Sequence, residues 1–327
     1  MRHFIKAASS VSCIAALLAA GSVFAQGADN YPNKPVNIVT PYAPGAATDI
    51  EGRLYANELS KNLGQQFIMD FKPGGVMTVG MNYAARQKPD GYNLVWTSST
   101  YSLLPLLTKD RNYDPIKDFD TVALMSKRSA ILVVANDLPV KNVKELVAYA
   151  KANPGKLNWA TGGNGGIQHL TGLWFASATN TDMTYVHFKS ISGAYPDLMA
   201  GRVHVLPGTF SAAFSMVKSG KIRAIAIASL QRNPAMPDMP TATEQGVPGF
   251  EYSSWLGMLA PAKTPPAIIN KLHAELVKII KIPEIKEKLG DETTLMALGP
   301  AEFRKIASTE TARWQKLISD NNIKLEE

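Results

Sequence analysis

The feature that most restricts the fold is an alternation of short apolar runs with amphipathic segments of helical period. Continuous apolar runs of about four to eight residues favour buried strands, and apolar residues spaced three or four apart favour helices. The expected strands are 36–40, 67–71, 92–97, 130–135, 157–160, 184–188, 203–206, 222–228 and 255–259. The expected helices between them are 49–63, 78–87, 143–152, 167–177, 193–200 and 211–218. Such alternation predicts α/β layers built on parallel sheets.

The alternation divides into two halves, which predicts two α/β lobes. A chain of 327 residues is long enough for about two domains. Two or three helices follow from residue 266 onward, and we expect them to return to the first lobe. The expected division is 26–127 with 253–327 in one lobe, and 128–252 in the other.

The first 25 residues have the pattern of a secretory signal peptide. Arg2 and Lys6 give a basic start, 11–20 is apolar, and small residues precede an expected cleavage site before Gln26. The alternative is a membrane anchor, but the run has only about half of the roughly 20 apolar residues that a spanning helix needs. We therefore expect an exported, periplasmic protein.

Composition excludes several functions of the exported chain. Its single cysteine, Cys13, lies within the expected signal and before most of the apolar run, so lipidation, disulfides and thiol chemistry are not expected. The net charge is +7, of which the signal carries two positive charges, and this mild excess suits small anionic ligands. No dense Lys/Arg block indicates nucleic acid. No later apolar run reaches membrane-spanning length.

Two loops share one design, in which a strand ends, small residues follow and a helix begins. The first is 45–49 and the second is 162–169, which we call the glycine loop. Ligands of open α/β sheets bind at the carboxyl ends of strands, and a helix N-terminus there suits a carboxylate or phosphate. The alternative is a pair of ordinary strand-to-helix turns.

Other polar and aromatic residues follow expected strands. Lys189, Ser190 and Ser192 could supply charge and hydroxyl donors, and Ser98 to Thr100 could donate similarly. Their alternatives are a solvated lysine and a polar loop. Tyr42, Tyr101 and Trp255 could form the apolar wall that an organic anion needs, or could belong to the core.

Nucleotide, metal and catalytic motifs are not recognisable. A dinucleotide fingerprint read from Gly163 would need a third glycine where Gln168 stands, and no phosphate-binding loop with a G-K-[ST] ending occurs. The histidines after the signal include no pair at i, i+4, and there is no G-x-S-x-G elbow. We expect no cofactor and no metal. A triad assembled from distant residues stays open.

Five segments together are specific enough to indicate a family. They are 31–35 (Y-P-N-K-P), 41–49 (P-Y-A-P-G-A-A-T-D), 73–75 (P-G-G), 89–92 (P-D-G-Y) and 255–261 (W-L-G-M-L-A-P). Across the whole chain after residue 26, the sequence resembles the substrate-binding proteins of tripartite tricarboxylate transporters, the TctC or Bug receptors.

The resemblance implies a type II periplasmic-binding-protein fold, with two α/β lobes joined by hinge strands that close over a carboxylate. By this resemblance and the loop argument, the candidate ligand-binding residues are Tyr42, Gly45, Ala46, Ala47, Thr48, Asp49, Ser98, Gly163, Gly165, Gly166, His169, Lys189, Ser190 and Ser192. His169 either contacts the ligand or packs.

The expected function is capture of a small organic carboxylate for membrane permease subunits of such a transporter, by a monomer without catalytic activity. The class of carboxylate stays open between aliphatic di- and tricarboxylates, acidic amino acids and aromatic acids. The alternatives are an exported α/β hydrolase-like enzyme and a ligand sensor for a membrane signalling partner.

Overall fold

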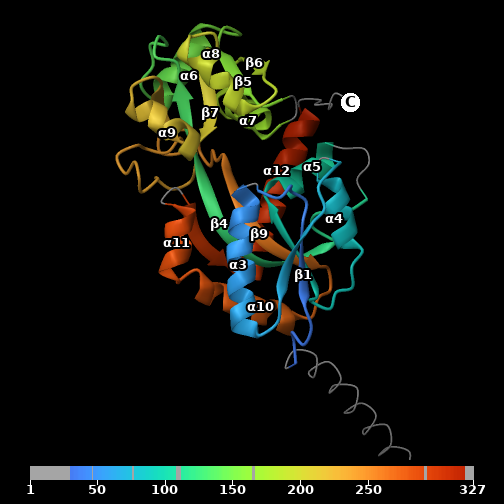
Figure 1. The fold of residues 1–327 in the computed structure, drawn as a ribbon. Helices are drawn as coiled ribbons and strands as arrows, with labels where there is room; N and C mark the ends of the chain where they lie inside the picture. Colours follow the sequence, from blue (N-terminus) through green and yellow to red (C-terminus); the bar gives the residue numbers. More distant parts are fainter. Residues whose placement is uncertain are drawn as a thin grey trace, which may run out of the picture.

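The structure is a computed structural model that describes residues 30–45, 47–75, 77–107, 112–163, 166–290 and 293–320. The expected signal peptide lies outside these ranges. The described chain forms two α/β lobes, one above the other in Figure 1. None of the helices in the described ranges is both long and apolar enough to cross a membrane.

The first lobe is built on a mixed sheet. Strands β2 (Phe67–Phe71), β1 (Val36–Thr40) and β3 (Asn93–Ser98) are parallel neighbours. β9 (Ser253–Pro261) lies antiparallel between β3 and β4 (Phe119–Val134), and β10 (Thr293–Leu298) pairs antiparallel with β4. Its helices are α3 (Ala47–Leu63), α4 (Thr78–Ala85), α5 (Thr100–Leu107), α10 (Pro266–Ile279), α11 (Pro283–Leu289) and α12 (Pro300–Asp320).

Neighbouring residues of one strand serve opposite faces of this sheet. Trp96 packs with residues of α3, α10 and α11, whereas Val95 packs with residues of α4, α5 and α12. Side chains alternate between the two faces of a strand, so helices on both sides produce a continuously apolar strand. This is why β3 could be recognised from its apolar run.

The second lobe repeats this three-layer plan. Its sheet contains β6 (Thr184–His187) at one edge, then β5 (Asn158–Thr161), β7 (Val205–Thr209) and the end of β4, with β8 (Arg223–Ile227) also paired to β4. Its helices are α6 (Val143–Ala152), α7 (Ile167–Thr179), the 3₁₀ turn η1 (Ile191–Ala194), α8 (Tyr195–Met199) and α9 (Phe210–Lys218). Residues of α6 and α7 cover one face, and residues of α8 and α9 cover the other.

Strand β4 belongs to both sheets. Its first part, from Phe119 to Ser129, pairs with β9 in the first lobe, and its last part, from Ala130 to Val134, pairs with β7 in the second. The chain returns through 228–252, where the Tyr252 amide donates to the Ala228 carbonyl at 2.8 Å. Both sheets are therefore mixed, which corrects the expectation of parallel sheets.

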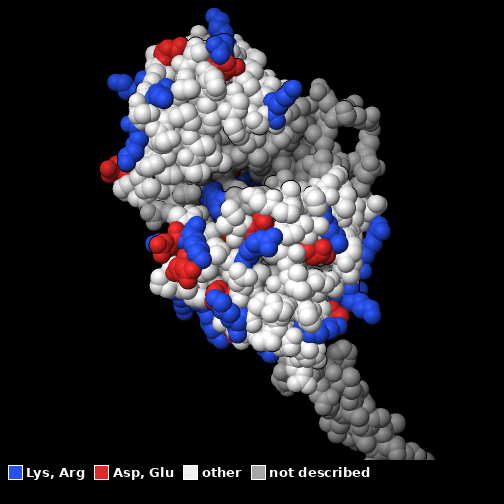
Figure 2. All heavy atoms as spheres, viewed as in Figure 1, with Lys and Arg blue, Asp and Glu red and all other residues white. Residues whose placement is uncertain are grey.

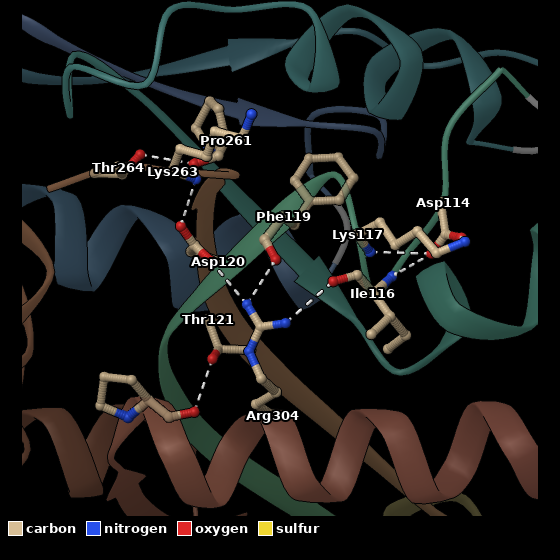
Figure 3. A network of polar contacts seen from close by, with 11 residues as sticks. Asp114, Ile116, Lys117, Phe119, Asp120, Thr121, Pro261, Lys263, Thr264 and Arg304 are labelled. Atoms are coloured by element: carbon tan, nitrogen blue, oxygen red, sulfur yellow. Dashed lines mark hydrogen bonds and ion pairs between the residues drawn. The ribbon is translucent and has the colours of Figure 1, made fainter. Parts of the chain in front are cut away.

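Helix α12 is fixed to the first lobe by polar contacts at its N-terminal half. Figure 3 shows the Arg304 guanidinium donating to the carbonyls of Ile116 and Phe119, both at 3.1 Å, and to the Asp120 carboxylate at 2.7 Å. The Thr121 hydroxyl also donates to the Pro300 carbonyl at 2.7 Å. These bonds hold the start of α12 against the start of β4.

The C-terminal half of α12 reaches the second lobe. Trp314 and Leu317 of α12 share an apolar cluster with Leu170 of α7 and Leu103 of α5. The Arg313 guanidinium lies 4.3 Å from the centre of the Trp174 ring of α7. In Figure 1 the end of α12, drawn in red, meets α7 at the junction of the lobes. The lobes thus touch through an apolar contact in addition to the two chain crossings.

Three details differ from the sequence predictions. The sequence predicts that Ile50, Leu54, Leu59 and Leu63 share the buried face of α3. Ile50 is instead 55% exposed, and Glu51 and Tyr55 are buried together with Leu59. The expected strand 130–135 is only the end of β4, which begins at Phe119, and β10 lies where only helices were expected. The proposed lobe boundaries stay a prediction.

Candidate functional site

The first loop leaves β1 and enters α3 at the junction of the lobes. Asp49 lies in the first turn of α3 and is only 4% exposed. Its Oδ2 accepts from the Gly45 amide at 2.8 Å, and its Oδ1 lies 2.7 Å from Arg53 Nε. Asp49 therefore fixes the shape of this loop, with Gly45 at a φ of 85° that favours glycine. Ala46 lies outside the described residues, and Ala47 is the first residue of α3.

Thr48 contributes two groups. Its carbonyl accepts from the Trp96 indole at 2.8 Å, which ties the start of α3 to β3. Its hydroxyl is buried and has no hydrogen-bond partner among the residues that the structure describes. An unpaired buried hydroxyl costs free energy, so this oxygen is a candidate for a ligand or water contact.

Tyr42 and Ser98 are joined directly. The Tyr42 hydroxyl lies 2.5 Å from Ser98 Oγ and accepts from the Ser98 amide at 3.2 Å. Burial raises the pKa of Tyr42, so its phenol is neutral at physiological pH. Tyr101 and Trp255, the other aromatic candidates, are buried in the core of the first lobe, which settles their alternative in favour of packing.

The glycine loop leaves β5 and enters α7 in the second lobe. The Gly163 carbonyl accepts from the Gly166 amide at 3.3 Å, and Gly163 has a φ of 127°. Gly166 is the N-cap of α7 and offers no side chain to bond the first amides of this helix. Gly165 lies outside the described residues.

His169, in the first turn of α7, is packed rather than open to solvent. It is 8% exposed, and its ring centre lies 4.9 Å from that of Tyr185 and 5.0 Å from that of His187. Burial, aided by His187, lowers the pKa of His169 to about 4. Its imidazole is therefore neutral at physiological pH and supplies no positive charge to the site.

Lys189, Ser190 and Ser192 form an exposed segment beside the glycine loop. The Phe188 amide donates to the Thr161 carbonyl at 2.9 Å. A methyl group added at Gly162 would lie 3.3 Å from the amide nitrogen of Ile191. Glycine at this position therefore allows the two segments of the second lobe to approach closely.

The two lobes also share a polar pocket at their junction. It is lined by Ser99 and Thr100 at the end of β3, Ile167 at the start of α7, Glu251, Tyr252, and Glu310, Arg313 and Trp314 of α12. Burial raises the pKa of Glu310 to about 7, while the Trp255 indole donates to its carboxyl group at 2.8 Å. Figure 2 shows the surface hollowed between the lobes.

Sequence reasoning missed two kinds of residue. Thr161 and His187 meet at the ends of β5 and β6, where Thr161 Oγ1 lies 2.7 Å from His187 Nδ1. Glu310 comes from α12, far along the chain. Thr161 could have been found because it directly precedes the glycine loop. Within the described ranges, no group of three His, Cys, Asp or Glu side chains gathers as metal ligands.

The family model of the tripartite tricarboxylate transporter family receptor, TctC, matches residues 52–323. The chain belongs to this family. It is 36% identical over 290 residues to a UPF0065 protein of Cupriavidus necator, covering 88% of each chain. It is 28% identical to the protein BugT of Bordetella pertussis over 94% of this chain and 95% of that one.

Solved structures agree with this assignment. A TctC solute-binding protein from Polaromonas has a TM-score of 0.81 at 26% identity. The match covers 89% of this chain and all of the Polaromonas chain. An R. palustris protein with adipate has a TM-score of 0.70 at 28% identity, covering 91% of this chain and all of that one. MatC from Rhodopseudomonas palustris with bound malate has a TM-score of 0.66 at 28% identity. The match covers 88% of this chain and all of MatC.

These matches confirm the resemblance seen in the motifs and the two-lobed fold of periplasmic binding proteins. The protein is a periplasmic solute-binding protein of the TctC family. A transporter receptor binds its solute rather than transforming it, so the enzyme alternative is set aside. The receptor role implies membrane components as partners.

Proposed function

We propose that the protein captures a small organic carboxylate in the interlobe cleft and delivers it to the permease subunits of a tripartite tricarboxylate-type transporter. The observation that supports this most is that two relatives of the same fold were solved with adipate and malate. Both ligands are dicarboxylates, which supports the first part of the proposed class, a di- or tricarboxylate or an aromatic carboxylate. Residues 1–25 would direct export and then be removed.

The proposed site uses the loops from both lobes. The first lobe would contribute the loop before α3, with the Thr48 hydroxyl, and the Tyr42–Ser98 pair. The second lobe would contribute the glycine loop and the segment of Lys189. The complete proposed set is Tyr42, Gly45, Ala46, Ala47, Thr48, Asp49, Ser98, Gly163, Gly165, Gly166, His169, Lys189, Ser190 and Ser192.

The chemistry of this set suits a carboxylate. Helix α7 is 13 residues long and its N-cap is a glycine without a side-chain cap, so its N-terminus offers amide donors and a partial positive charge. In this proposal the carboxylate of the buried Asp49 does not contact the ligand, because its two oxygens already have Gly45 and Arg53 as partners. It shapes the loop whose amides and hydroxyl bind.

A thermal-shift screen of the chain from residue 26 tests the proposal. The panel contains adipate, malate, citrate, an aromatic carboxylate and the matching amides. A ligand at 100 times its Kd adds about 2.7 kcal/mol to the free energy of unfolding. We expect a shift with at least one carboxylate and none with its amide.

Binding-site variants sharpen the screen. Thr48→Ala should weaken binding without changing the unliganded melting temperature, whereas Ser308→Ala, on the exposed side of α12, should change neither. If the protein purified free of small molecules, as checked by mass spectrometry after denaturation, shows no carboxylate binding, the proposed function is wrong.

A further inference from the structure

His187 and Thr161 meet because of the register of two parallel strands. β5 and β6 pair with Thr161 opposite His187, so both side chains leave the sheet on the same face and at its carboxyl end. Thr161 is fully buried and His187, on the edge strand, is exposed. Thr161 Oγ1 and His187 Nδ1 lie 2.7 Å apart, which is a short hydrogen bond.

Thr161 connects His187 to Gly163 in the glycine loop. Its hydroxyl donates to the Gly163 carbonyl at 3.2 Å and accepts from the Gly163 amide at 3.3 Å. The same carbonyl receives the Gly166 amide at 3.3 Å, one residue before α7 begins. The Thr161 side chain therefore bonds both the amide and the carbonyl of Gly163. The same Gly163 carbonyl accepts from Gly166 at the turn into α7.

Whether His187 Nδ1 carries a proton decides which hydrogen bonds the Thr161 hydroxyl can make. A threonine hydroxyl has one proton to donate. If His187 Nδ1 carries a proton, it donates to Thr161, and Thr161 is free to donate to Gly163. If Nδ1 is bare, Thr161 donates to the ring instead and the Gly163 carbonyl loses that bond. Only the cation and one neutral tautomer of His187 complete the network.

We propose that His187 is a positioning residue of the ligand site: a proton on Nδ1 fixes Thr161 and, through it, Gly163 in the position that the turn into α7 needs to receive the carboxylate. This inference rests on the proposed function of the cleft. The cationic ring carries this proton necessarily and also adds a positive charge beside an anion site. Ligand binding and protonation of His187 should therefore favour each other.

The surrounding groups leave His187 as the source of such an effect. Among the described residues, His169 on α7 contacts the His187 ring, Tyr185 on β6 contacts His169, and Lys189 follows His187 by two residues. Burial lowers the pKa of His169 to about 4, and burial raises the pKa of Tyr185. Neither ring therefore changes charge between pH 5 and 8.

The first test needs no ligand. In ¹⁵N-labelled protein, we expect the Gly163 amide resonance to shift with pH along the same curve as the ring nitrogens of His187. In His187→Asn, which can place an N–H donor where Nδ1 stands but does not titrate, the Gly163 resonance should become independent of pH. A wild-type Gly163 resonance that is unchanged when the ring ¹⁵N shifts report a bare Nδ1, or that is the same in Thr161→Val, overturns the proposal, whether or not any carboxylate binds.

The second test measures the Kd of adipate and of malate by calorimetry from pH 5.5 to 8. Where the ring ¹⁵N shifts show that Nδ1 becomes bare as the pH rises, the wild-type affinity should fall about threefold to tenfold, as the loss of one hydrogen bond implies. His187→Asn should keep the affinity at low pH and show a flat profile. Thr161→Val should bind weakly at every pH, and Thr161→Ser should behave as the wild type. His187→Phe removes the donor that orients Thr161, so it should bind more weakly than His187→Asn at every pH.

A matched control separates this effect from general histidine titration. His273→Asn, on α10 in the first lobe, should retain the wild-type pH profile, because its ring contacts the Ala297 carbonyl and lies in the other lobe.

Wild-type affinity in His187→Phe at all pH values would refute the positioning role while leaving the carboxylate function intact. Absence of binding by both probes would count against the proposed function alone, and the ligand-free test would still decide the inference.

Discussion

Glu310 makes a prediction whose size can be worked out from its surroundings. The side chain is 7% exposed, the Trp255 indole donates to it at 2.8 Å, and Glu251, Lys127 and Arg313 lie near enough to act on it. Burial raises its pKa from 4.5 to about 7. Since the folded protein holds this proton more tightly than the unfolded chain, Glu310 favours the folded state below about pH 4.5 and loses that advantage as the pH rises to about 7.

The magnitude follows from the two pKa values. A difference of about 2.5 pH units, at 1.36 kcal/mol for each, makes the folded state roughly 3 kcal/mol less stable at pH 8 than at pH 4.5 through this one group. Glu310→Gln mimics the protonated side chain and keeps an acceptor for Trp255. Relative to the wild type, the variant should therefore gain about 3 kcal/mol at pH 8 and change little at pH 4.5.

Guanidinium unfolding followed by tryptophan fluorescence at both pH values gives the comparison, and the shift of the midpoint is read at constant slope. Glu302→Gln, an exposed residue of the same helix, is the control and should show no such pH-dependent gain. If Glu310→Gln changes stability equally at pH 4.5 and pH 8, the pKa of the buried carboxyl group is not raised in the folded protein and the prediction is wrong.

Three further variants test the packing. Arg128→Met should cost about 3 kcal/mol, because the fully buried Glu51 carboxylate loses the cation 3.3 Å away, and adding Glu51→Gln should recover most of it in the same unfolding assay. Gly172→Ala should cost about 1–3 kcal/mol in melting experiments, since its methyl carbon would lie 2.7 Å from a tyrosine ring. Trp174→Ala should loosen the contact with Trp314, lowering stability by about 2 kcal/mol and increasing the radius of gyration in solution scattering; an unchanged radius would mean that this contact does not restrain the lobes.

Local signals predicted single elements well. Helix α6 was predicted to the residue, since Asn142 accepts from the Glu145 amide as an N-cap and the run Asn153-Pro154-Gly155 ends the helix. β10 was missed because its alternation is weak and only two of its residues are buried, so nothing in 293–298 distinguishes it from a loop between helices.

Long-range pairing was beyond local signals. β9 pairs with β3 through Val95 and Leu259, and this contact leaves no trace in either segment alone. An apolar run indicates a buried strand but not the direction of its neighbours, which is why parallel sheets were predicted where mixed sheets form.

The candidate site divides in the same way. The glycine loop was visible because its glycines are concentrated immediately after a strand. No sequence motif around His187 indicated a role for it, since that role depends on the strand register that places it opposite Thr161. The packing of His169 against Tyr185 and His187 likewise arises from α7 lying over β6.

The position of β9 between β3 and β4 also determines the order in which the molecule can assemble. The second sheet uses only strands between β4 and β8, so its pairing partners are available once residue 227 has been made. The first sheet stays divided until β9 arrives, with β1 to β3 on one side and the start of β4 on the other. Its closure joins residues more than 150 positions apart, a slow step that exposes unpaired strand edges meanwhile. A chaperone that shields nascent β3 would protect the half of the protein that folds last.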